Sequence, residues 1–426
     1  MPHLTDVLER LYARRRFGIR PGVDRVGTLL ERLGNPDKQF RTIHVVGTNG
    51  KGSTSAFLSN ILLHAGLSVA QFSSPHLVRF TERFRINGSE YSTDKLVQRL
   101  DIVLKATPDE ATFFEITTAL AAYIFSEEQV EFAIMEAGMG GRSDATAAFT
   151  GELTILTPIA IDHAEYLGTS LEDIAKEKAG IIKPRTRVIS AEQPEAVRLA
   201  IAEQCHIAEC DVKTLGTDFS AEWALDHTLN YHGLSRSLTQ LTPGIPGRYQ
   251  AANAALALAA AESLETDGTE ITPSSFKEGI AGAAWPGRME LVPGTPRLLL
   301  DGAHNPAGAA ALAEALHDYS YSRLLMVTGV CDDKDIGQIY APLLPLVDGI
   351  YTVTPAVDRA MKDEVLTQFF RSQGIESEPC GSVVAGIGKA RSRAAESDLI
   401  LVCGSLFVVG EVKAWLEQAN YTGIRG

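Results

Sequence analysis

Short apolar runs alternate with helix-period patterns along the first half of the chain. Phe57, Leu58, Ile61 and Leu62 recur at helical spacing and predict an amphipathic helix over about 51–65, with Gly66 suited to its C-terminal cap. Most of the other runs are apolar throughout, which is typical of strands in a parallel sheet covered on both faces. The predicted strands are residues 42–47, 68–73, 131–138, 153–158 and 187–190. A strand, a helix and a second strand in this order predict a βαβ unit.

A second alternating series follows a Pro/Gly-rich stretch, AAWPGRME, at residues 283–290. Before it, residues 244–264 are typical of a turn and an Ala-rich helix. After it, Asn305 suits an N-cap and Pro306 the first position of a helix. Further strands are predicted at residues 297–301, 324–329, 349–354 and 398–405. The pattern predicts an α/β protein with two domains, residues 1–287 and 288–426, and a ligand cleft between them.

The turn after the first predicted strand is rich in glycine and resembles a phosphate-binding loop. It lies within IHVVGTNGKGSTSAFLSN at residues 43–60, but Gly52 follows Lys51 where the common G-x-x-x-x-G-K-[ST] loop has a hydroxyl residue. The glycines allow backbone N–H groups to face phosphate oxygens, and Lys51 adds a positive charge. Ser53 or Thr54 can offer a hydroxyl to Mg²⁺. The alternative is a turn with a solvated lysine, but the strand–turn–helix context favours phosphate binding.

Polar residues after later strands are candidates for a metal site. Glu136 ends an apolar run and is either a carboxylate for the metal or a solvated glutamate. His163 follows another strand and is either a metal ligand through a neutral ring nitrogen or a structural histidine. Lys178 lies among apolar residues, so burial would lower its pKa and make the amine nucleophilic enough to form a carbamate with CO₂. The alternative for Lys178 is a helix lysine paired with Glu177.

Three residues near the predicted domain boundary suit a nucleotide. Arg288 lies in WPGRME, and Asp301 and His304 lie in LDGAHNP, where an Arg and an Asp at a cleft mouth can clamp phosphate and ribose. Asp144, after the strand predicted at residues 131–138, suits a second metal acceptor or a substrate site.

Composition excludes several classes of protein. The 426 residues are 45% hydrophobic and 22% charged, as in an ordinary soluble protein, and no run approaches the length of a membrane span. The net charge of −14 argues against non-specific nucleic-acid binding. The first 18 residues have the pattern of an amphipathic helix and lack the apolar core of a signal peptide. Five cysteines without C-x-x-C pairing indicate free thiols, and we expect a cytoplasmic protein.

Taken together, these motifs resemble folylpolyglutamate synthase and dihydrofolate synthase, the folate branch of the ATP-dependent Mur ligase superfamily. The matching runs follow the family order along nearly the whole chain: GTNGKGS (47–53), SSPHLVRFTERFRING (73–88), TFFE (112–115), EAGMGGRSDAT (136–146), DHAEYLG (162–168), EKAGIIK (177–183), GRYQAANA (247–254), WPGRME (285–290), LDGAHNP (300–306), DDKD (332–335) and GSLFVVGEV (404–412). The resemblance implies a P-loop ATPase domain with a mainly parallel sheet and a smaller Rossmann-like C-terminal domain.

The resemblance also implies roles for individual residues. ATP would be bound by Gly47, Thr48, Asn49, Gly50, Lys51, Gly52, Ser53, Asn253, Arg288 and Asp301. Two Mg²⁺ ions would be held by Ser53, Ser74, Glu136, His163 and a carbamylated Lys178. The folate side would be lined by Thr112, Phe113, Phe114, Glu115, Ser143, Asp144 and Ala145. Lys51, Lys178 and His304 would take part in catalysis, His304 near the phosphoryl group or glutamate.

The implied reaction joins L-glutamate to a folate or to dihydropteroate and is driven by ATP hydrolysis to ADP and phosphate. We expect the protein to be a monomer. Two departures from the family pattern lie on the folate side: Ser143 stands where the family has an apolar residue, and Ala147 where it has Asn. One alternative is a monofunctional folylpolyglutamate synthase. Another is a cell-wall amino-acid ligase, against which the SPHL, TFFE and EKAG runs argue. A regulatory GTPase is disfavoured because the guanine-reading N-K-x-D motif is absent from the sequence. A non-catalytic nucleotide-binding module is disfavoured because the candidate metal ligands are all present.

Overall fold

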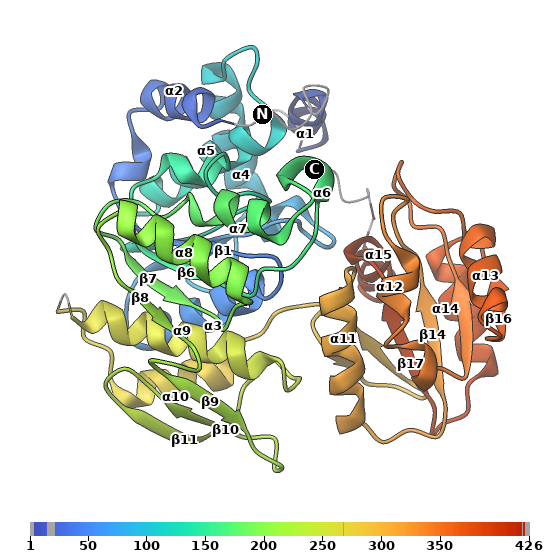
Figure 1. Ribbon diagram of the computed structural model, residues 1–426. Coiled ribbons are helices and arrows are strands. Elements are labelled where there is room, and N and C mark those ends of the chain that lie inside the picture. Colours follow the sequence, from blue (N-terminus) through green and yellow to red (C-terminus); the bar gives the residue numbers. More distant parts are fainter. Residues whose placement is uncertain (1–3, 15–21, 267, 420, 422–426) are drawn as a thin grey trace.

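The computed structural model describes residues 4–14, 22–266, 268–419 and 421, and Figure 1 shows them as two α/β domains side by side. The N-terminal domain is built on an eight-stranded sheet with the order β4-β3-β2-β5-β1-β6-β7-β8. The neighbouring strands β2, β5, β1, β6, β7 and β8 run parallel. Its strands are β1 (Arg41–Val46), β2 (Val69–Phe72), β3 (Phe84–Ile86), β4 (Ser89–Glu90), β5 (Phe132–Glu136), β6 (Gly151–Leu156), β7 (Arg187–Ser190) and β8 (Val212–Thr214).

Helices cover both faces of this sheet, which explains why its strands are apolar throughout. One face packs against α3 (Lys51–His64) and α9 (Gln250–Glu265), with α10 (Pro273–Gly282) beside them. The other face is covered by helices from the rest of the domain. These are α1 (Leu4–Tyr12), α2 (Asp24–Arg32), α4 (Thr93–Ala106), α5 (Phe113–Glu127), α7 (Leu171–Ala179) and α8 (Glu195–Ile207), with the short α6 (Ala164–Leu167) before α7.

The five strands predicted for this domain are confirmed, and each lies within two residues of its predicted bounds. The helix predicted over 51–65 is confirmed as α3, and Gly66 follows it with a φ of 81°. The amphipathic character predicted for α3 is wrong, because its polar residues Ser53, Thr54 and Ser55 are also buried. The reason is that α9 and α10 both pack against α3, which also contacts the sheet, so no face of α3 is left to solvent.

A three-stranded antiparallel sheet lies beside α9 and α10, at the bottom of Figure 1. It consists of β9 (Ser220–Trp223), β10 (Leu229–His232) and β11 (Ser237–Leu241). Its strands are short and partly exposed, and the sequence analysis did not predict them.

The C-terminal domain holds a six-stranded sheet with the order β12-β13-β17-β14-β15-β16, parallel except for β12 at one edge. Helices lie on both of its faces, as in a doubly wound Rossmann-like domain. The strands are β12 (Glu290–Val292), β13 (Arg297–Leu300), β14 (Leu324–Thr328), β15 (Gly349–Thr352), β16 (Ser377–Pro379) and β17 (Leu399–Cys403). The helices are α11 (Pro306–Ala315), α12 (Ile336–Tyr340), α13 (Asp363–Ser372), α14 (Val383–Arg393) and α15 (Leu406–Leu416).

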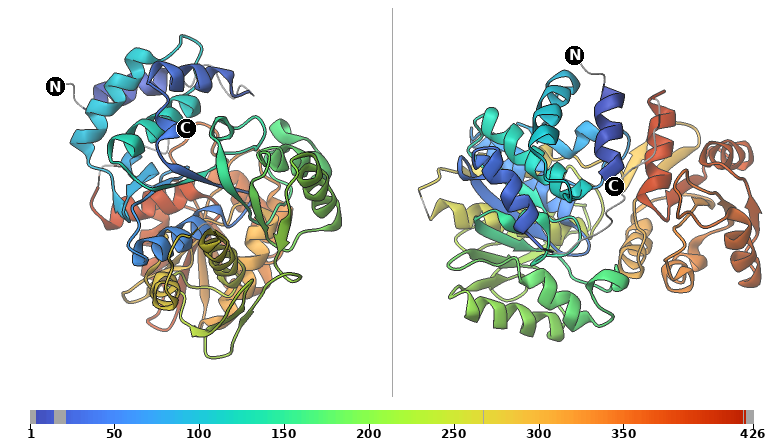
Figure 2. Two further views of the ribbon diagram at one scale, coloured as in Figure 1. Left: turned by 90° about the vertical axis from the view of Figure 1, so that its left-hand side faces the viewer. Right: turned by 90° about the horizontal axis from the view of Figure 1, so that it is seen from above.

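The four strands predicted after residue 290 are confirmed, and so is the helix at Pro306, capped by Asn305. Seen from above in Figure 2, the C-terminal domain lies against one side of the N-terminal domain. Among the described residues, none of the helices has the length and apolar character needed to cross a bilayer. All five cysteines are free thiols, as predicted. The N-terminal helix predicted over the first 18 residues is present as α1, but residues 1–3 and 15–18 lie outside the described part of the chain.

Candidate active site

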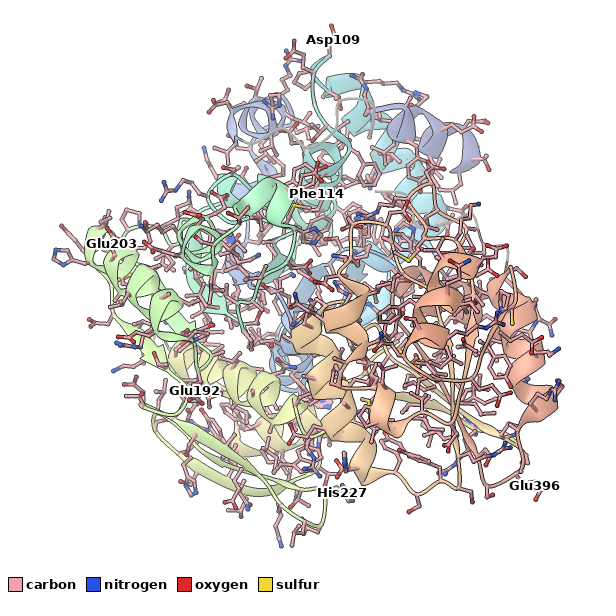
Figure 3. All side chains as sticks on the ribbon, turned by 45° about the vertical axis from the view of Figure 1, so that its right-hand side comes forward. Asp109, Phe114, Glu192, Glu203, His227 and Glu396 are labelled. Atoms are coloured by element: carbon pink, nitrogen blue, oxygen red, sulfur yellow. The ribbon has the colours of Figure 1, made fainter. Side chains whose placement is uncertain are left out.

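A cleft of about 1990 Å³ lies between the two domains at the carboxyl end of β1. Ligands of parallel α/β sheets bind at this end of the strands. Phe114, labelled in Figure 3, lies at the start of α5 and lines this cleft. Every residue predicted for the site lines this cleft: residues 47–53, Ser74, residues 112–115, Glu136, residues 143–145, His163, Lys178, Asn253, Arg288, Asp301 and His304.

The glycine-rich loop connects β1 to α3 and is packed too closely for larger residues. A Cβ on Gly50, whose φ is 87°, would lie 2.2 Å from Asn253 Oδ1. A Cβ on Gly52 would lie 2.5 Å from the ring nitrogen of Trp285. Gly52, which departs from the common loop, is therefore required by the approach of the Trp285 ring.

Part of the loop is held by its own domain. The backbone N–H groups of Thr48 and Asn49 donate to Pro158 O at 2.9 and 3.3 Å, so these two groups fix the loop. Lys51 Nζ folds back over the loop and donates to Gly47 O and Thr48 O at 3.2 and 3.3 Å. The ammonium group of Lys51 thus lies over the loop on the side that lines the cleft.

Glu136 ends β5, the strand next to β1, and pairs with Val45. Its side chain is 5% exposed, so a solvated glutamate, one of the two interpretations of the sequence, is wrong. Burial raises the pKa of Glu136 to about 7, although the charges of Lys51 and Arg288 act in the opposite direction. A carboxylate in this position favours a neighbouring cation.

Lys178 lies near the end of α7 and is 3% exposed. Its Nζ donates to Gly47 O at 3.0 Å and to Met139 O at 2.6 Å, which places the amine directly beside the phosphate loop. A salt bridge between Lys178 and Glu177 is not formed, because a Glu177 carboxylate oxygen accepts from Ser143 N at 2.9 Å instead. Burial, with a smaller contribution from Lys51, lowers the pKa of Lys178 to about 7.

On the predicted folate side, the polar atoms of residues 112–115 serve the start of α5. Thr112 and Glu115 form a capping box, and Glu115 is also paired with Arg25 at 2.7 Å. The aromatic rings are left to line the cleft: Phe113 stacks on Tyr12 with ring centroids 5.8 Å apart.

Arg83 is a cleft residue that the sequence analysis missed. It is 1% exposed, its guanidinium lies 5.3 Å from the centre of the Phe113 ring, and its Nε donates to His76 Nδ1 at 2.9 Å. Arginines are seldom this buried without a partner or a ligand. The signal in the sequence was weak, because Arg83 is one of three arginines in VRFTERFR.

Asp144 organises the loop after β5. Its Oδ2 accepts from the N–H groups of Gly138 and Met139 at 3.0 and 3.2 Å, and its Oδ1 accepts from Thr146 N at 3.0 Å. These bonds position Ser143 and Ala145 on the cleft wall. Asp144 is thus engaged with its own loop through both carboxylate oxygens.

From the C-terminal domain, Asp301 and His304 reach the same cleft. Asp301 accepts from Tyr249 OH at 3.0 Å, Met289 N at 3.0 Å and Ala303 N at 2.9 Å. His304 Nε2 lies 3.4 Å from Asp162 Oδ2, across the domain boundary. Asp162 opens the DHAEYLG run, but the sequence predicted no role for it, because a carboxylate after a strand has many uses.

His163 lies next to Asp162 with a φ of 52° and a side chain that lines the cleft. Burial lowers the pKa of His163 to about 4, although Asp162 acts to raise it, so the ring is neutral at pH 7. The neutral ring is the form that coordinates metals. Within the described residues no group of three His, Cys, Asp or Glu side chains is placed to hold a metal ion. Among the predicted metal ligands, only Glu136 and His163 are of these four residue types.

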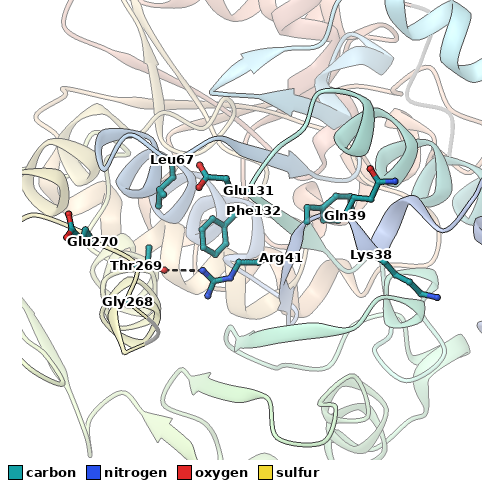
Figure 4. A pocket seen from close by; sticks show the side chains of 10 residues that line it. Lys38, Gln39, Arg41, Leu67, Glu131, Phe132, Gly268, Thr269 and Glu270 are labelled. Carbon is teal, nitrogen blue, oxygen red and sulfur yellow. Dashed lines mark hydrogen bonds between the residues drawn. The ribbon is translucent and has the colours of Figure 1, made fainter.

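A second pocket, of about 590 Å³, lies at the opposite end of β1 and is shown in Figure 4. Its Arg41 is paired with Glu152 at 2.7 Å, donates to Thr269 at 3.1 Å and lies 4.4 Å from the centre of the Phe132 ring. None of the predicted site residues lines this pocket. The candidate active site is therefore the interdomain cleft.

Comparison with known proteins agrees with this arrangement. Residues 45–261 match the Mur ligase middle domain, and residues 287–406 match the Mur ligase glutamate ligase domain. The dihydrofolate synthase/folylpolyglutamate synthase of Bacillus subtilis is 32% identical over 97% of this chain and 99% of its own length. A probable bifunctional folylpolyglutamate synthase/dihydropteroate synthase of Haloferax volcanii is 33% identical, and the chain spans about half the length of that relative.

Solved structures give the same result. Escherichia coli FolC in complex with DHPP and ADP superposes with a TM-score of 0.89 at 32% identity, over 98% of this chain and 99% of that one. A bifunctional folylpolyglutamate synthase/dihydrofolate synthase with Mn, AMPPNP and L-glutamate bound has a TM-score of 0.88 at 30% identity, over 98% and 99%. Fold and site thus define a two-domain ligase of the Mur type. Within this class, the chain belongs to the folylpolyglutamate synthase/dihydrofolate synthase family.

Proposed function

We propose that the protein is an ATP-dependent amide ligase that adds L-glutamate to folates and to dihydropteroate through an acyl-phosphate intermediate. The observation that carries this proposal is the cleft itself, in which the phosphate loop, Lys178 and the C-terminal residues Arg288 and His304 line one space of about 1990 Å³. That volume is large enough for a nucleotide, a pteridine and an amino acid together. Complexes of relatives with ADP and DHPP, and with AMPPNP, Mn and L-glutamate, support the same ligands here.

The nucleotide is bound at the phosphate loop. Lys51 exchanges its two carbonyl contacts for the β- and γ-phosphates, and the N–H groups at the start of α3 face the same oxygens. Asn253, packed against Gly50, and Arg288, beside Gly302, reach the cleft from the two domains and bind the rest of ATP. Asp301 has three internal donors, so its role is to hold this wall as much as to contact the ribose.

Two Mg²⁺ ions fit the donor set around the loop. Ser53 and Ser74 supply hydroxyls, Glu136 a buried carboxylate and His163 a neutral ring, all along the cleft. Hard cations prefer oxygen ligands such as the two hydroxyls and the carboxylate. A divalent cation would favour the ionised form of Glu136. When bound, Mg²⁺ neutralises charge on the transferring phosphoryl group.

Lys178 is the proposed site of a carbamate. Because burial lowers its pKa to about 7, a large fraction of the amine is neutral at physiological pH and can attack CO₂. The N–C bond forms and one proton is released, so the neutral amine becomes an anion. The product would serve as a fifth protein ligand in the metal site.

In the proposed reaction, the acceptor carboxylate attacks the γ-phosphorus and ADP leaves. The amine of L-glutamate then attacks the acyl carbon, inorganic phosphate leaves and the amine proton is lost. The chain's residues hold the reacting groups together and exclude water, with Phe113, Phe114, Ser143 and Ala145 along the folate side. His304 lies at the boundary, near the phosphoryl group or glutamate.

The decisive experiment measures phosphate release that depends on both ATP and L-glutamate, with dihydropteroate and with tetrahydrofolate as separate acceptors. We expect activity with both. Activity with tetrahydrofolate alone would make the enzyme a monofunctional folylpolyglutamate synthase, and activity with neither would overturn the proposal. We also propose that the domains are residues 1–287 and 288–426, which the separate sheets support and limited proteolysis tests. We propose a cytoplasmic monomer as well, and gel filtration tests the oligomeric state.

A further inference from the structure

Asp162 joins the two domains at the edge of the cleft. It follows β6 in the N-terminal domain, yet its carboxylate is bonded to three residues of the C-terminal domain. Oδ1 accepts from Lys334 Nζ at 2.8 Å, and Oδ2 accepts from Asn305 Nδ2 at 3.2 Å and lies 3.4 Å from His304 Nε2. The side chains of Asp162 and Lys334 are only 7% and 12% exposed.

Other ion pairs between the domains have at least one partner that is more open to solvent. Arg79 and Glu417 are 48% and 38% exposed, and Arg248 is 37% exposed beside Asp318 at 14%. Exposed pairs contribute little to stability because water screens them. A buried pair costs desolvation of both charges and is stabilised only when its partners meet in one geometry. The contact of Asp162 and Lys334 therefore specifies one relative position of the domains.

This contact continues into the phosphate loop. Asn305 and Asn49 exchange amide hydrogen bonds, from Asn49 Nδ2 at 3.1 Å and from Asn305 Nδ2 at 3.0 Å. Asn49 directly precedes Gly50 and Lys51. An uninterrupted series of hydrogen bonds thus leads from Lys334 through Asp162 and Asn305 to the loop.

We propose that Asp162, Lys334 and Asn305 form an interdomain latch that positions the C-terminal domain over the phosphate loop during the reaction. The inference rests on the proposed ligase function but names residues to which that function assigns no role. They are positioning residues, because they act through the placement of Lys51, Arg288 and His304. Separation of the domains would expose the carboxylate and the ammonium to water, so the latch forms only in the closed arrangement.

A double-mutant cycle tests the latch. The variants are Asp162→Asn, Lys334→Met and the double variant, with Asp318→Asn as a matched control that removes a more exposed interdomain pair outside the cleft lining. Lys334 also acts electrostatically on His163, so the Mg²⁺ dependence of turnover is measured for each variant to separate a latch effect from a metal-site effect. For each variant, kcat and the KM values for ATP and L-glutamate are measured. X-ray scattering gives the radius of gyration with and without AMPPNP and Mg²⁺.

We expect each single variant to lower kcat by about tenfold or more and to weaken the compaction caused by AMPPNP. The double variant should be no slower than the slower single variant, which for a tenfold effect is a coupling of about 1.4 kcal/mol. Additive effects of the two substitutions on kcat would overturn the latch. So would single variants whose kcat and radius of gyration match those of Asp318→Asn. A wild-type protein inactive with both acceptors would overturn the proposed function instead, while scattering would still report on the latch.

Discussion

Asn49 and Asn305 exchange two amide hydrogen bonds, although 256 positions separate them in the sequence. Asn305 Oδ1 also accepts from Gly308 N at 2.8 Å and caps α11. Asn305 therefore connects the phosphate loop of one domain to the first turn of a helix in the other. Substitutions can separate the two roles.

Asn305→Ser keeps a capping oxygen but removes the amide that pairs with Asn49. We expect its turnover to fall about tenfold and its unfolding free energy to fall by about 1 kcal/mol, because the amide bonds to Asn49 and Asp162 are lost while the cap is kept. Asn305→Ala should lose a similar amount of turnover and about 1 kcal/mol more stability, because the cap is lost too. Urea denaturation and phosphate-release assays measure the two effects, and full turnover in Asn305→Ser would exclude a role for the amide pair.

Gly50 and Gly66 flank α3 with similar backbone angles, φ of 87° and 81°, but only Gly50 is crowded. Either change to Ala costs roughly 1–2 kcal/mol from the left-handed backbone. Gly50→Ala also forces Asn253 away from the loop, so we expect ATP affinity to fall by about tenfold or more. Gly66→Ala has open space around its Cβ and should bind ATP normally. Titration calorimetry with AMPPNP compares them, and equal affinities would contradict the close packing of the loop.

Lys178→Ala should abolish turnover while the fold is largely retained. The matched control is Lys176→Ala on the same helix, where the lysine is 51% exposed and paired with Glu172. We expect the control to keep most of its activity, because an exposed pair at this spacing contributes only a few tenths of a kcal/mol. With ¹³C-bicarbonate, wild type should give a carbamate signal in NMR spectra and Lys178→Ala should not. Full activity in Lys178→Ala would refute the carbamate.

His44 should make the protein less stable in acid. It lies in β1, fully buried, with both ring nitrogens lacking a hydrogen-bond partner. Burial, with a contribution from Lys183, lowers its pKa from 6.5 to about 3. Between these values the unfolded chain binds a proton that the folded chain does not, so this contribution to stability is present above pH 6.5 and is lost as the pH falls toward 3.

Two variants of His44 separate its titration from its polarity. His44→Leu and His44→Gln should both flatten the loss of unfolding free energy between pH 6.5 and 4, measured by urea denaturation. Only His44→Leu also removes the buried unpaired polar atoms, so it should be the more stable of the two at pH 7. An unchanged acid slope in both variants would show that His44 does not titrate on unfolding.

Most of the central strands could be predicted because they are buried on both faces and therefore apolar throughout. The sheet of β9, β10 and β11 was missed because its short, half-exposed strands have no such pattern. The character of α3 was mistaken for a related reason, since the packing of α9 and α10 against it depends on residues about 200 positions away. The family motifs indicated which side chains gather in the cleft, whereas the roles of the predicted site residues stay predictions.

The sequence by itself determined the central strands of the two domains, the form of the phosphate loop and the residue types of the site, because these depend on local spacing and chemistry. The tertiary structure decided how those residues are used. It shows that Gly52 is required by the approach of Trp285, that Lys178 bonds to carbonyls and not to Glu177, and that Asp162 accepts hydrogen bonds from the other domain. Each of these contacts joins positions far apart in the chain or chooses between local partners, and only the packed fold brings the atoms within reach.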